Sequence, residues 1–271
     1  MKRQVAVLGS GPAGLLAAHA ATIWGFEAHI ISATTEPSKL YGAQYLHEAI
    51  PEIPHSAPVE ISVELRGTVN DYREKVYGAD YKGPVSPAVL QGGHFGWDIR
   101  QAYNWLWDTY GNEIYDFRFN PVSFADFAKT QAVYYDYIFS SIPLVQVCGD
   151  VTHEFFSQHV YAIGDAQELG IECPVRTEPN MIRHDGTKDT SWYRASNIFG
   201  HGTAEWPAQR KKPPIAGLAV VTKPLSTNCT CGPNIIRIGR YGQWKKGVLA
   251  HTAFEQVDRI MRGTGVQDAL F

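Results

Sequence analysis

The sequence predicts an α/β fold in which a parallel central sheet carries an inserted, mixed region. Three observations predict it: a glycine-rich strand–turn–helix pattern at the start of the chain, an apolar strand at residues 135–143, and a second strand, glycine turn and helix near the other end. Strands that alternate with helices form parallel sheets. The 271 residues can bury one sizeable core, or hold a nucleotide domain with a smaller substrate domain set into it.

The first element is a buried strand at residues 4–8, followed by a glycine turn and an alanine-rich helix that reaches residue 24. Gly9 permits the tight turn, Gly11 lets the backbone approach a pyrophosphate, and Gly14 lets the helix pack closely on the strand. The helix N-terminus offers free N–H groups and a partial positive charge. This Rossmann-like pattern predicts dinucleotide binding, and the expected contacts are Gly9, Gly11, Pro12, Ala13 and Gly14.

The second strand, residues 28–31, ends at Ser32, where an acidic residue normally binds the adenosine ribose. Ser32 can still bond a ribose hydroxyl, and Glu36 or Lys39 can reach the same sugar or a phosphate. No arginine closely follows the strand, which disfavours the 2′-phosphate of NADP. These residues leave both FAD and NAD open.

A long loop follows, and residues 39–51 combine glycine, amide, aromatic and imidazole side chains as a binding loop needs. His47 is the candidate general base because an imidazole titrates near neutral pH, and Tyr41 or Gln44 would orient the substrate. Gly42 and Ala43 complete the expected binding loop. The alternative is an aromatic turn with a satisfied histidine.

The middle of the chain predicts the inserted region. Residues 61–95 alternate apolar and polar positions between glycine and proline breaks, which favours an antiparallel piece. Residues 97–110 have apolar positions at helical spacing, with three tryptophans expected in core or interface packing or, as the alternative, in the wall of a substrate cleft. The strand ending Gly164-Asp165 is typical of flavoproteins, but its distance from the end of the chain favours a strand and polar turn of the substrate region.

Residues 176–210 are dense in polar and aromatic groups, which are costly to bury unless they pair with each other or with a ligand. Arg183 and Arg194 are candidate anion clamps, because guanidinium groups bind carboxylate and phosphate through two hydrogen bonds. We add Tyr193 to this predicted substrate site. The alternative is a surface hairpin with internal ion pairs.

Near the other end, residues 234–249 predict a strand, a glycine turn and a helix that runs to about Met261. Its N-terminus near residues 244–248 would stabilise negative charge on a bound ring. His251 would lie inside this helix and is the poorer base. The expected cofactor contacts at this end are Gly239, Arg240, Gly242, Trp244, Val248 and Leu249.

Together the two glycine turns resemble the glutathione-reductase-like FAD superfamily, in particular its UDP-galactopyranose mutase and flavin amine oxidase branch. The resemblance is carried by Gly9, Gly11 and Gly14, by residues 137–143, and by the turn at residues 239–242. It implies FAD, with the pyrophosphate at the first helix and the flavin at the last. It also implies that Gly42, Ala43 and Gln44 lie beside the flavin. The chain departs from the family pattern at Ser32 and in its shorter length.

Composition limits the remaining classes. The net charge of −3 does not indicate a nucleic-acid surface, although local basic patches stay open, and no apolar run is long enough to span a bilayer. The four cysteines form no Cys-x-x-Cys, which favours a reducing, cytoplasmic compartment. Cys229 and Cys231 are interpreted as two loop thiols, so no metal is predicted. The oligomeric state stays open.

The leading hypothesis is an FAD-dependent oxidoreductase of amine-oxidase type, which transfers hydride from a small or nucleotide-linked amine to the flavin. The alternatives are a mutase-like reaction on a sugar nucleotide without net redox change, and a flavin- or NAD-binding module without catalysis. The predicted cofactor domain comprises residues 1–60, 130–165 and 215–271. The predicted substrate region comprises residues 61–129 and 166–214.

Overall fold

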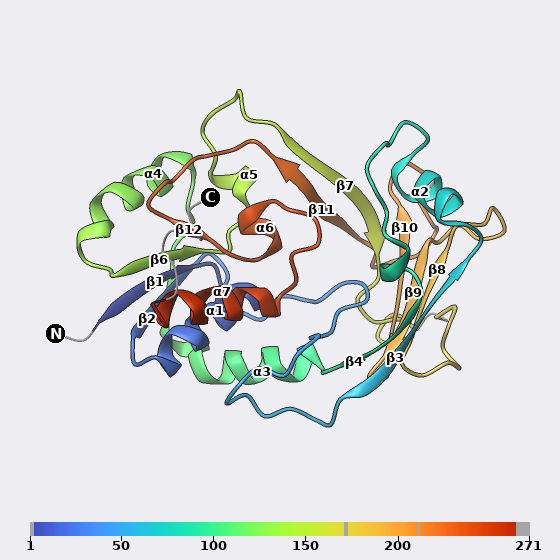
Figure 1. Ribbon diagram of the computed structural model, residues 1–271, viewed down its shortest axis with the longest axis horizontal. Helices are drawn as coiled ribbons and strands as arrows, with labels where there is room; N and C mark the ends of the chain where they lie inside the picture. Colours follow the sequence, from blue (N-terminus) through green and yellow to red (C-terminus); the bar gives the residue numbers. More distant parts are fainter. Residues whose placement is uncertain (1–2, 171–172, 211, 264–271) are drawn as a thin grey trace.

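The computed structural model describes residues 3–170, 173–210 and 212–263, and its strands form two sheets (Figure 1). The first sheet is parallel throughout, and the strands pair in the order β12-β6-β1-β2-β5. This confirms the predicted fold class of a parallel central sheet with an inserted mixed region. The strands are β1 (Gln4–Leu8), β2 (Glu27–Ser32), β5 (Ile114–Asp116), β6 (Tyr137–Ser140) and β12 (Ile236–Arg237).

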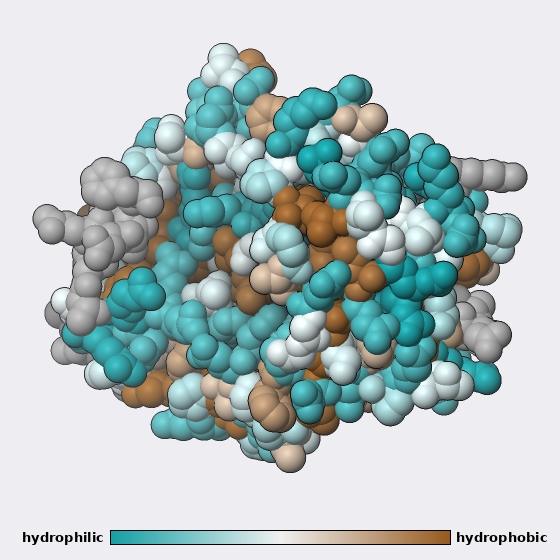
Figure 2. All heavy atoms as spheres, turned by 45° about the vertical axis from the view of Figure 1, so that its right-hand side comes forward, coloured by the Kyte–Doolittle hydropathy of each residue, from teal (hydrophilic) through white to brown (hydrophobic). Residues whose placement is uncertain are grey.

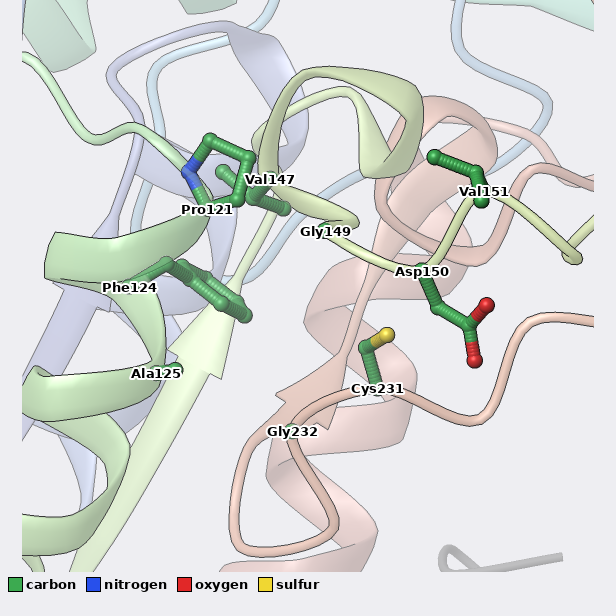
Figure 3. A pocket seen from close by; sticks show the side chains of 9 residues that line it. All are labelled: Pro121, Phe124, Ala125, Val147, Gly149, Asp150, Val151, Cys231 and Gly232. Carbon is green, nitrogen blue, oxygen red and sulfur yellow. The ribbon is translucent and has the colours of Figure 1, made fainter.

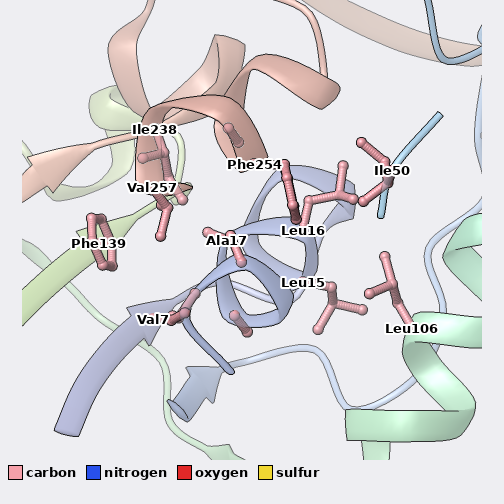
Figure 4. Close-up of a cluster of buried hydrophobic side chains, with 14 of the residues drawn as sticks. Val7, Leu15, Leu16, Ala17, Ile50, Leu106, Phe139, Ile238, Phe254 and Val257 are labelled. Atoms are coloured by element: carbon pink, nitrogen blue, oxygen red, sulfur yellow. The ribbon is translucent and has the colours of Figure 1, made fainter. Parts of the chain in front are cut away.

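Three helices, α1 (Pro12–Ile23), α3 (Ile99–Tyr110) and α7 (His251–Met261), pack together on one face of this sheet (Figure 4). Alanines make α1 narrow, so α7 and α3 both approach it closely, and Leu15 and Leu16 are fully buried between them. Each such side chain contributes about 1.5–3 kcal/mol when it is buried. The other face is covered by α4 (Pro121–Thr130) and the short α5 (Leu144–Val147).

The second sheet is mixed, in the order β11-β7-β10-β9-β8-β3-β4, with only the β3–β8 pair parallel. Helix α2 (Val69–Tyr77) covers one face, where Tyr72 and Val76 pack against Val160. The strands are β3 (Val59–Arg66), β4 (Gly92–Gly96), β7 (Phe155–Ala162), β8 (Met181–Asp185), β9 (Arg194–Ile198), β10 (His201–Pro207) and β11 (Ala219–Thr227). Short 3₁₀ turns lie at Pro87–Val89, Gly111–Glu113 and Gln131–Val133.

The predicted helix at residues 97–110 is confirmed as α3, and its tryptophans lie in core packing. Trp107 is buried, and Trp97 and Trp105 pack against the same core. The predicted antiparallel piece is also present, since β3 and β4 form an antiparallel pair. Period and spacing were therefore sufficient for these two elements.

The predicted final helix is wrong in its first half. The helix α6 (Gly239–Gln243) ends at Trp244, whose left-handed backbone (φ 50°, ψ 48°) stops it, and α7 begins only at His251. Trp244 is buried, and its indole N–H donates to the Phe156 carbonyl at 3.1 Å, which anchors this break. The helix N-terminus expected near residues 244–248 therefore lies at His251, and Leu249 precedes the helix.

The strands divide the chain differently from the predicted domain boundaries. Strand β5 falls in the range 61–129, which we assigned to the substrate region, but it pairs with β2 in the parallel sheet. Strands β7 and β11 fall in ranges assigned to the cofactor domain, yet they form the edge of the second sheet (Figure 1). The three-residue β5 is too short to show a strand period, which is why the sequence pattern missed it.

The face of the molecule seen in Figure 2 is mostly hydrophilic, and apolar side chains gather near its middle. No helix among the described residues is both long enough and apolar enough to cross a membrane.

Candidate functional site: two glycine turns and a buried charge cluster

The first glycine turn has the geometry of a nucleotide-binding turn. Gly9 has φ 100°, and a Cβ on Gly14 would lie 1.9 Å from the Gly9 carbonyl oxygen, so neither position accepts a side chain without strain. A Cβ on Gly11 would meet nothing within 4 Å, so this point faces open space. Among the described residues, no side chain caps the N-terminus of α1. The turn therefore presents uncapped helix N–H groups beside an accessible backbone, as anion binding requires.

The second glycine turn lies directly against the first. A Cβ on Gly239 (φ 66°) would come within 2.5 Å of the Ala13 Cβ, and one on Gly242 would come within 2.3 Å of the Ser140 carbonyl oxygen. Arg240 donates to the Pro224 carbonyl at 3.1 Å. Its Nε is buried and has no partner among the described residues, and burial lowers the pKa of this guanidinium. The structure thus brings the two glycine turns together and leaves a buried donor, the Arg240 Nε, beside their contact.

At the end of β2, Ser32 is buried and held by its neighbours. Its Oγ accepts hydrogen bonds from the Ser10 hydroxyl at 2.9 Å and from the Thr34 N–H at 3.1 Å. Lys39 lies farther along, in an exposed ion pair with Glu168 at 3.0 Å. These contacts give Ser32 a structural role in the turn and place the Lys39 ammonium at the surface.

The loop after β2 reaches the second sheet through Gly42. The Gly42 N–H donates to the Ile163 carbonyl at 3.4 Å, and a Cβ there would lie 1.9 Å from a carboxylate oxygen of Glu205. Ala43 packs against the apolar residues of β3 and β8. The Gln44 side chain donates to the Tyr41 carbonyl at 2.8 Å and so braces the loop. The predicted binding loop therefore lies between the two sheets.

Four rings pack together at the same interface, and we call Tyr45, His47, His94 and His251 the ring cluster. The His47 ring lies 4.5 Å from the Tyr45 ring, 5.2 Å from His94 and 5.6 Å from His251, centroid to centroid. Burial, with His94 and His251 next, lowers the pKa of His47 to about 4. His47 is therefore neutral at pH 7 and a weaker base than the sequence hypothesis assumed.

Polar and charged side chains from β9, β10 and β11, and from the residue before β9, meet on one face of the second sheet, where β7 lies between β10 and β11. We call Tyr193, Arg194, Glu205 and Lys223 the buried charge cluster. Glu205 is 2% exposed and bonds to the other three residues. Lys223 also donates to the Tyr193 hydroxyl at 2.7 Å. The Nε of Arg194 is buried and unpartnered among the described residues.

The charges of this cluster shift one another's protonation. Burial alone would raise the pKa of Glu205, but Arg194 and Lys223 hold it below its usual range. Burial, and then Arg194, lower the pKa of Lys223 to about 7 despite the opposing effect of Glu205. Strongly shifted groups at a domain interface are typical of functional sites. The Glu205 carboxylate thus faces the Arg194 guanidinium and a Lys223 amine that is partly protonated at neutral pH, and Arg240 lies close enough to interact electrostatically with this cluster.

The two predicted anion clamps are not together. Arg194 on β9 lies opposite His184 on β8, so these two side chains share a face of the sheet. Arg183 directly precedes His184 and therefore points to the opposite face. There Arg183 binds Glu64 at 3.0 Å and Glu178 at 2.6 Å. The structure brings Tyr193 and Arg194 to the interface and places Arg183 in a surface ion-pair network.

Sequence reasoning did not select Glu205, Lys223, Tyr45 or His94 as site residues. The available signal was a charged residue between apolar neighbours in a strand, as for Glu205 between Ala204 and Trp206. The position of Asp165 agrees with the interpretation of residues 159–166 as a strand and polar turn of the substrate region. The preceding strand β7 belongs to the second sheet, and the Asp165 carboxylate binds His201 Nδ1 at 2.7 Å.

Two cavities lie away from this interface. The larger, of about 510 Å³, opens between α4 and the loops that carry Asp150 and Cys231 (Figure 3). The smaller, of about 260 Å³, lies between α2 and the loop after β8. Neither is lined by a residue of the two glycine turns.

Comparison with known proteins supports the fold class. No protein-family model and no curated protein sequence matches the chain. Among solved structures, a C294A mutant of 2-methyl-3-hydroxypyridine-5-carboxylic acid oxygenase aligns with a TM-score of 0.52 at 12% identity, covering 100% of this chain and 85% of that one. The tetrameric form of the same oxygenase aligns with a TM-score of 0.51 at 11% identity, covering 97% and 87%.

A structure of the rebeccamycin biosynthetic enzyme RebC with reduced flavin aligns with a TM-score of 0.49 at 10% identity, covering 100% of this chain and 63% of that one. The two alignments with the oxygenase show that this chain shares its fold. The narrower mutase and amine oxidase branch stays a prediction.

Proposed function

We propose that the chain binds FAD across its two glycine turns and is an FAD-dependent oxidoreductase. The observation that carries this proposal is the contact of Gly239 with Ala13, because it places the second turn beside the uncapped N-terminus of α1. Open space at Gly11 and the unpartnered Nε of Arg240 fit a pyrophosphate and a neighbouring polar group. The fold shared with an oxygenase supports the same class.

When bound, FAD would supply two-electron chemistry at its flavin ring. The protein's own residues would bind and orient. The N–H groups of Ala13 and Gly14 would hold the pyrophosphate, and Arg240 would donate from the second turn. Residues 42–44 would border the flavin, and Gly42 now contacts Glu205, so a flat ring there requires the loop to separate from the second sheet.

The charges at the interface favour an anionic substrate. Arg194 and Arg240 carry positive charge at neutral pH and Lys223 carries part of one, against the single carboxylate of Glu205. The interface therefore attracts a carboxylate or phosphate and repels a protonated amine. This argues against the amine substrate of our leading sequence hypothesis. His47, neutral at pH 7, would act there as a hydrogen-bond partner of the substrate.

A mutase-like reaction on a sugar nucleotide is the second candidate. The positive charge at the interface favours this candidate as well. Arg194 and Arg240 each have a buried Nε without a partner among the described residues, and both could bind a diphosphate. The two candidates differ in their need for reductant: a mutase is active only with reduced flavin and gives no net redox change. Activity that requires added dithionite would identify the mutase, and flavin bleaching by substrate without oxygen would identify the oxidoreductase.

The cofactor proposal is tested by the visible spectrum of the purified protein and a matched pair of glycine variants. We expect a yellow protein that releases FAD on heating. Gly11→Ala should weaken FAD binding by at least about tenfold, because its methyl group occupies the space for the pyrophosphate. Gly93→Ala is the control, since Gly93 also has room for a Cβ but lies on β4. A colourless protein that fails to bind added FAD would contradict the proposal.

The substrate class is tested by the flavin spectrum during titration. We expect small aromatic carboxylates or organic phosphates to perturb the spectrum and to lose this effect in Arg194→Met. Arg183→Met is the matched control, because Arg183 lies on the opposite face of the sheet. Perturbation by amines alone would restore the amine-oxidase hypothesis.

A further inference from the structure

A second cluster of reactive side chains lies outside the proposed flavin site, where β7 begins and β11 ends. Cys148 directly follows α5, and His153 lies two residues before β7. Cys229 and Cys231 lie in the loop between β11 and β12. Cys148 and Cys229 are 81 residues apart in the sequence, yet one ligand atom from each of the four residues lies within 4.8 Å of all the others. We call these four residues the cysteine cluster.

The distances within this cluster fit a tetrahedral metal site. Cys148 Sγ lies 3.4 Å from Cys231 Sγ and 3.5 Å from Cys229 Sγ. His153 Nδ1 lies 3.1 Å from Cys148 Sγ and 3.6 Å from Cys231 Sγ. Metal–ligand distances of a tetrahedral zinc site imply ligand separations of about 3.6–3.8 Å. The four separations are at or below the lower end of this range, so the ligand atoms are close enough together to share one ion. The sulfur separations are well above the roughly 2.05 Å of a disulfide.

The imidazole of His153 is oriented for coordination. Its Nδ1 faces the sulfurs, and its Nε2 lies 3.7 Å from the Asp150 carboxylate. A carboxylate on that side favours the tautomer with hydrogen on Nε2 and leaves the Nδ1 lone pair free for a metal. This pairing of carboxylate and histidine is common behind metal-binding histidines.

Arg237 supplies the charge balance. Its guanidinium lies 3.9 Å from Cys229 Sγ and donates to the carbonyl oxygens of Cys229, at 2.7 Å, and Cys231. A divalent ion with three thiolates and one neutral imidazole carries one net negative charge, which this guanidinium neutralises. The Cys231 N–H also points at Cys229 Sγ, at 3.5 Å. The loop is thus held in the shape that presents both sulfurs.

We propose that Cys148, His153, Cys229 and Cys231 bind one zinc ion. Three thiolates and an imidazole in a tetrahedral arrangement select zinc among common divalent metals, and four protein ligands form a closed, structural type of site. The ion would join the α5–β7 loop to the β11–β12 loop. The 510 Å³ cavity beside Cys231 gives solvent, and hence the metal, access to the cluster (Figure 3).

The first test is the metal content of the untagged full-length protein, purified with reductant and passed over a chelating resin. We expect about one zinc per chain by mass spectrometry of the metal, and loss of that zinc in Cys229→Ser. Cys173→Ser is the matched control, because Cys173 is the remaining cysteine and its thiol donates to backbone carbonyls in the second sheet. It should keep the zinc. None of these readouts depends on bound flavin.

Two further measurements keep the proposal falsifiable if Cys229→Ser fails to fold. Replacing zinc with cobalt in the wild-type protein should give the strong visible bands of a tetrahedral, thiolate-bound ion. Asp150→Asn leaves all four ligands in place, and should weaken zinc binding about 10–100-fold in competition with a chelator. Wild-type protein that takes up no zinc while four free thiols titrate in denaturant would overturn the proposal. Two missing thiols, which mean a disulfide, would overturn it as well.

Discussion

The first glycine turn and the buried charge cluster both contribute to the proposed flavin site, but they are built in opposite ways. The glycine turn uses backbone geometry within six consecutive residues, and its function depends on side chains being absent. The charge cluster uses side chains from three strands, and each charge depends on the others. The difference teaches that a site made of backbone can be read locally, whereas a site made of paired charges exists only after folding.

The largest expected effect comes from removing the carboxylate at the centre of the charge cluster. Glu205→Gln leaves Arg194 and Lys223 buried without a counter-charge, so we expect the free energy of unfolding to fall by about 3–5 kcal/mol. Urea denaturation measures this. Glu178→Gln is the control, since Glu178 pairs with Arg183 at the surface and should cost less than about 1 kcal/mol. Equal losses would show that the cluster is no more coupled than a surface pair.

In the glycine turn, the effect of adding a methyl group should depend on which glycine receives it. Gly14→Ala forces its methyl group against the Gly9 carbonyl, so we expect the free energy of unfolding to fall by about 1–3 kcal/mol and FAD binding to be lost. The free energy of unfolding of Gly11→Ala should stay within about 1 kcal/mol of the wild-type value, because the added Cβ has open space. Thermal melts without cofactor separate the two. A Gly11→Ala protein as unstable as Gly14→Ala would contradict the backbone interpretation.

His184 lies on the same face of the sheet as the charge cluster, and it should make the free energy of unfolding fall at acid pH. Burial, and then Arg194, lower the pKa of His184 to about 3. The unfolded state binds the proton below about pH 6.5, so stability is lost as the pH falls from 6.5 towards 3. Between pH 7 and pH 5 this amounts to about 2 kcal/mol. Urea denaturation at both pH values should show the loss in the wild type and a smaller loss in His184→Gln.

The smallest effect on stability is expected for Arg183, which directly precedes His184 on β8 and points to the opposite face of the sheet. Arg183→Met removes surface ion pairs with Glu64 and Glu178, and should change the free energy of unfolding by less than about 1 kcal/mol. Arg194→Met should cost several times more, because it strands Glu205. Similar losses in the two variants, measured by urea denaturation, would remove the distinction between the faces.

Local patterns predicted much of the fold. The turn at Gly9–Gly14 and the helix α3 follow from glycine spacing and from apolar period, both of which act over a few residues. The break between α6 and α7 could not be predicted from local patterns, because the left-handed conformation of Trp244 depends on tertiary packing and on its hydrogen bond to the Phe156 carbonyl. Tertiary contacts outweighed helical periodicity at that point.

The candidate sites show the same limit. Arg194 and Tyr193 were predicted from composition, but their partner Lys223 lies 29 or 30 residues farther along and reaches them only across the sheet. The cysteine cluster was missed because Cys148 and Cys229 are separated by 81 residues, and neither shows a local metal-binding spacing. Pairings that strand register creates are not visible before the strands are aligned.

The long pair β7–β11 connects two of these regions, since the cysteine cluster lies just beyond one end and Lys223 lies within it, opposite Gln158. The pair contains a bulge between Pro224 and Ser226, the kind of irregularity at which alignment can slip. A slip by one residue would turn Lys223 to the other face, away from Glu205. A zinc ion bound at the cysteine cluster, as we propose, would hold the two loops together and so fix the alignment of these strands, and with it the side of the sheet on which Lys223 meets Glu205.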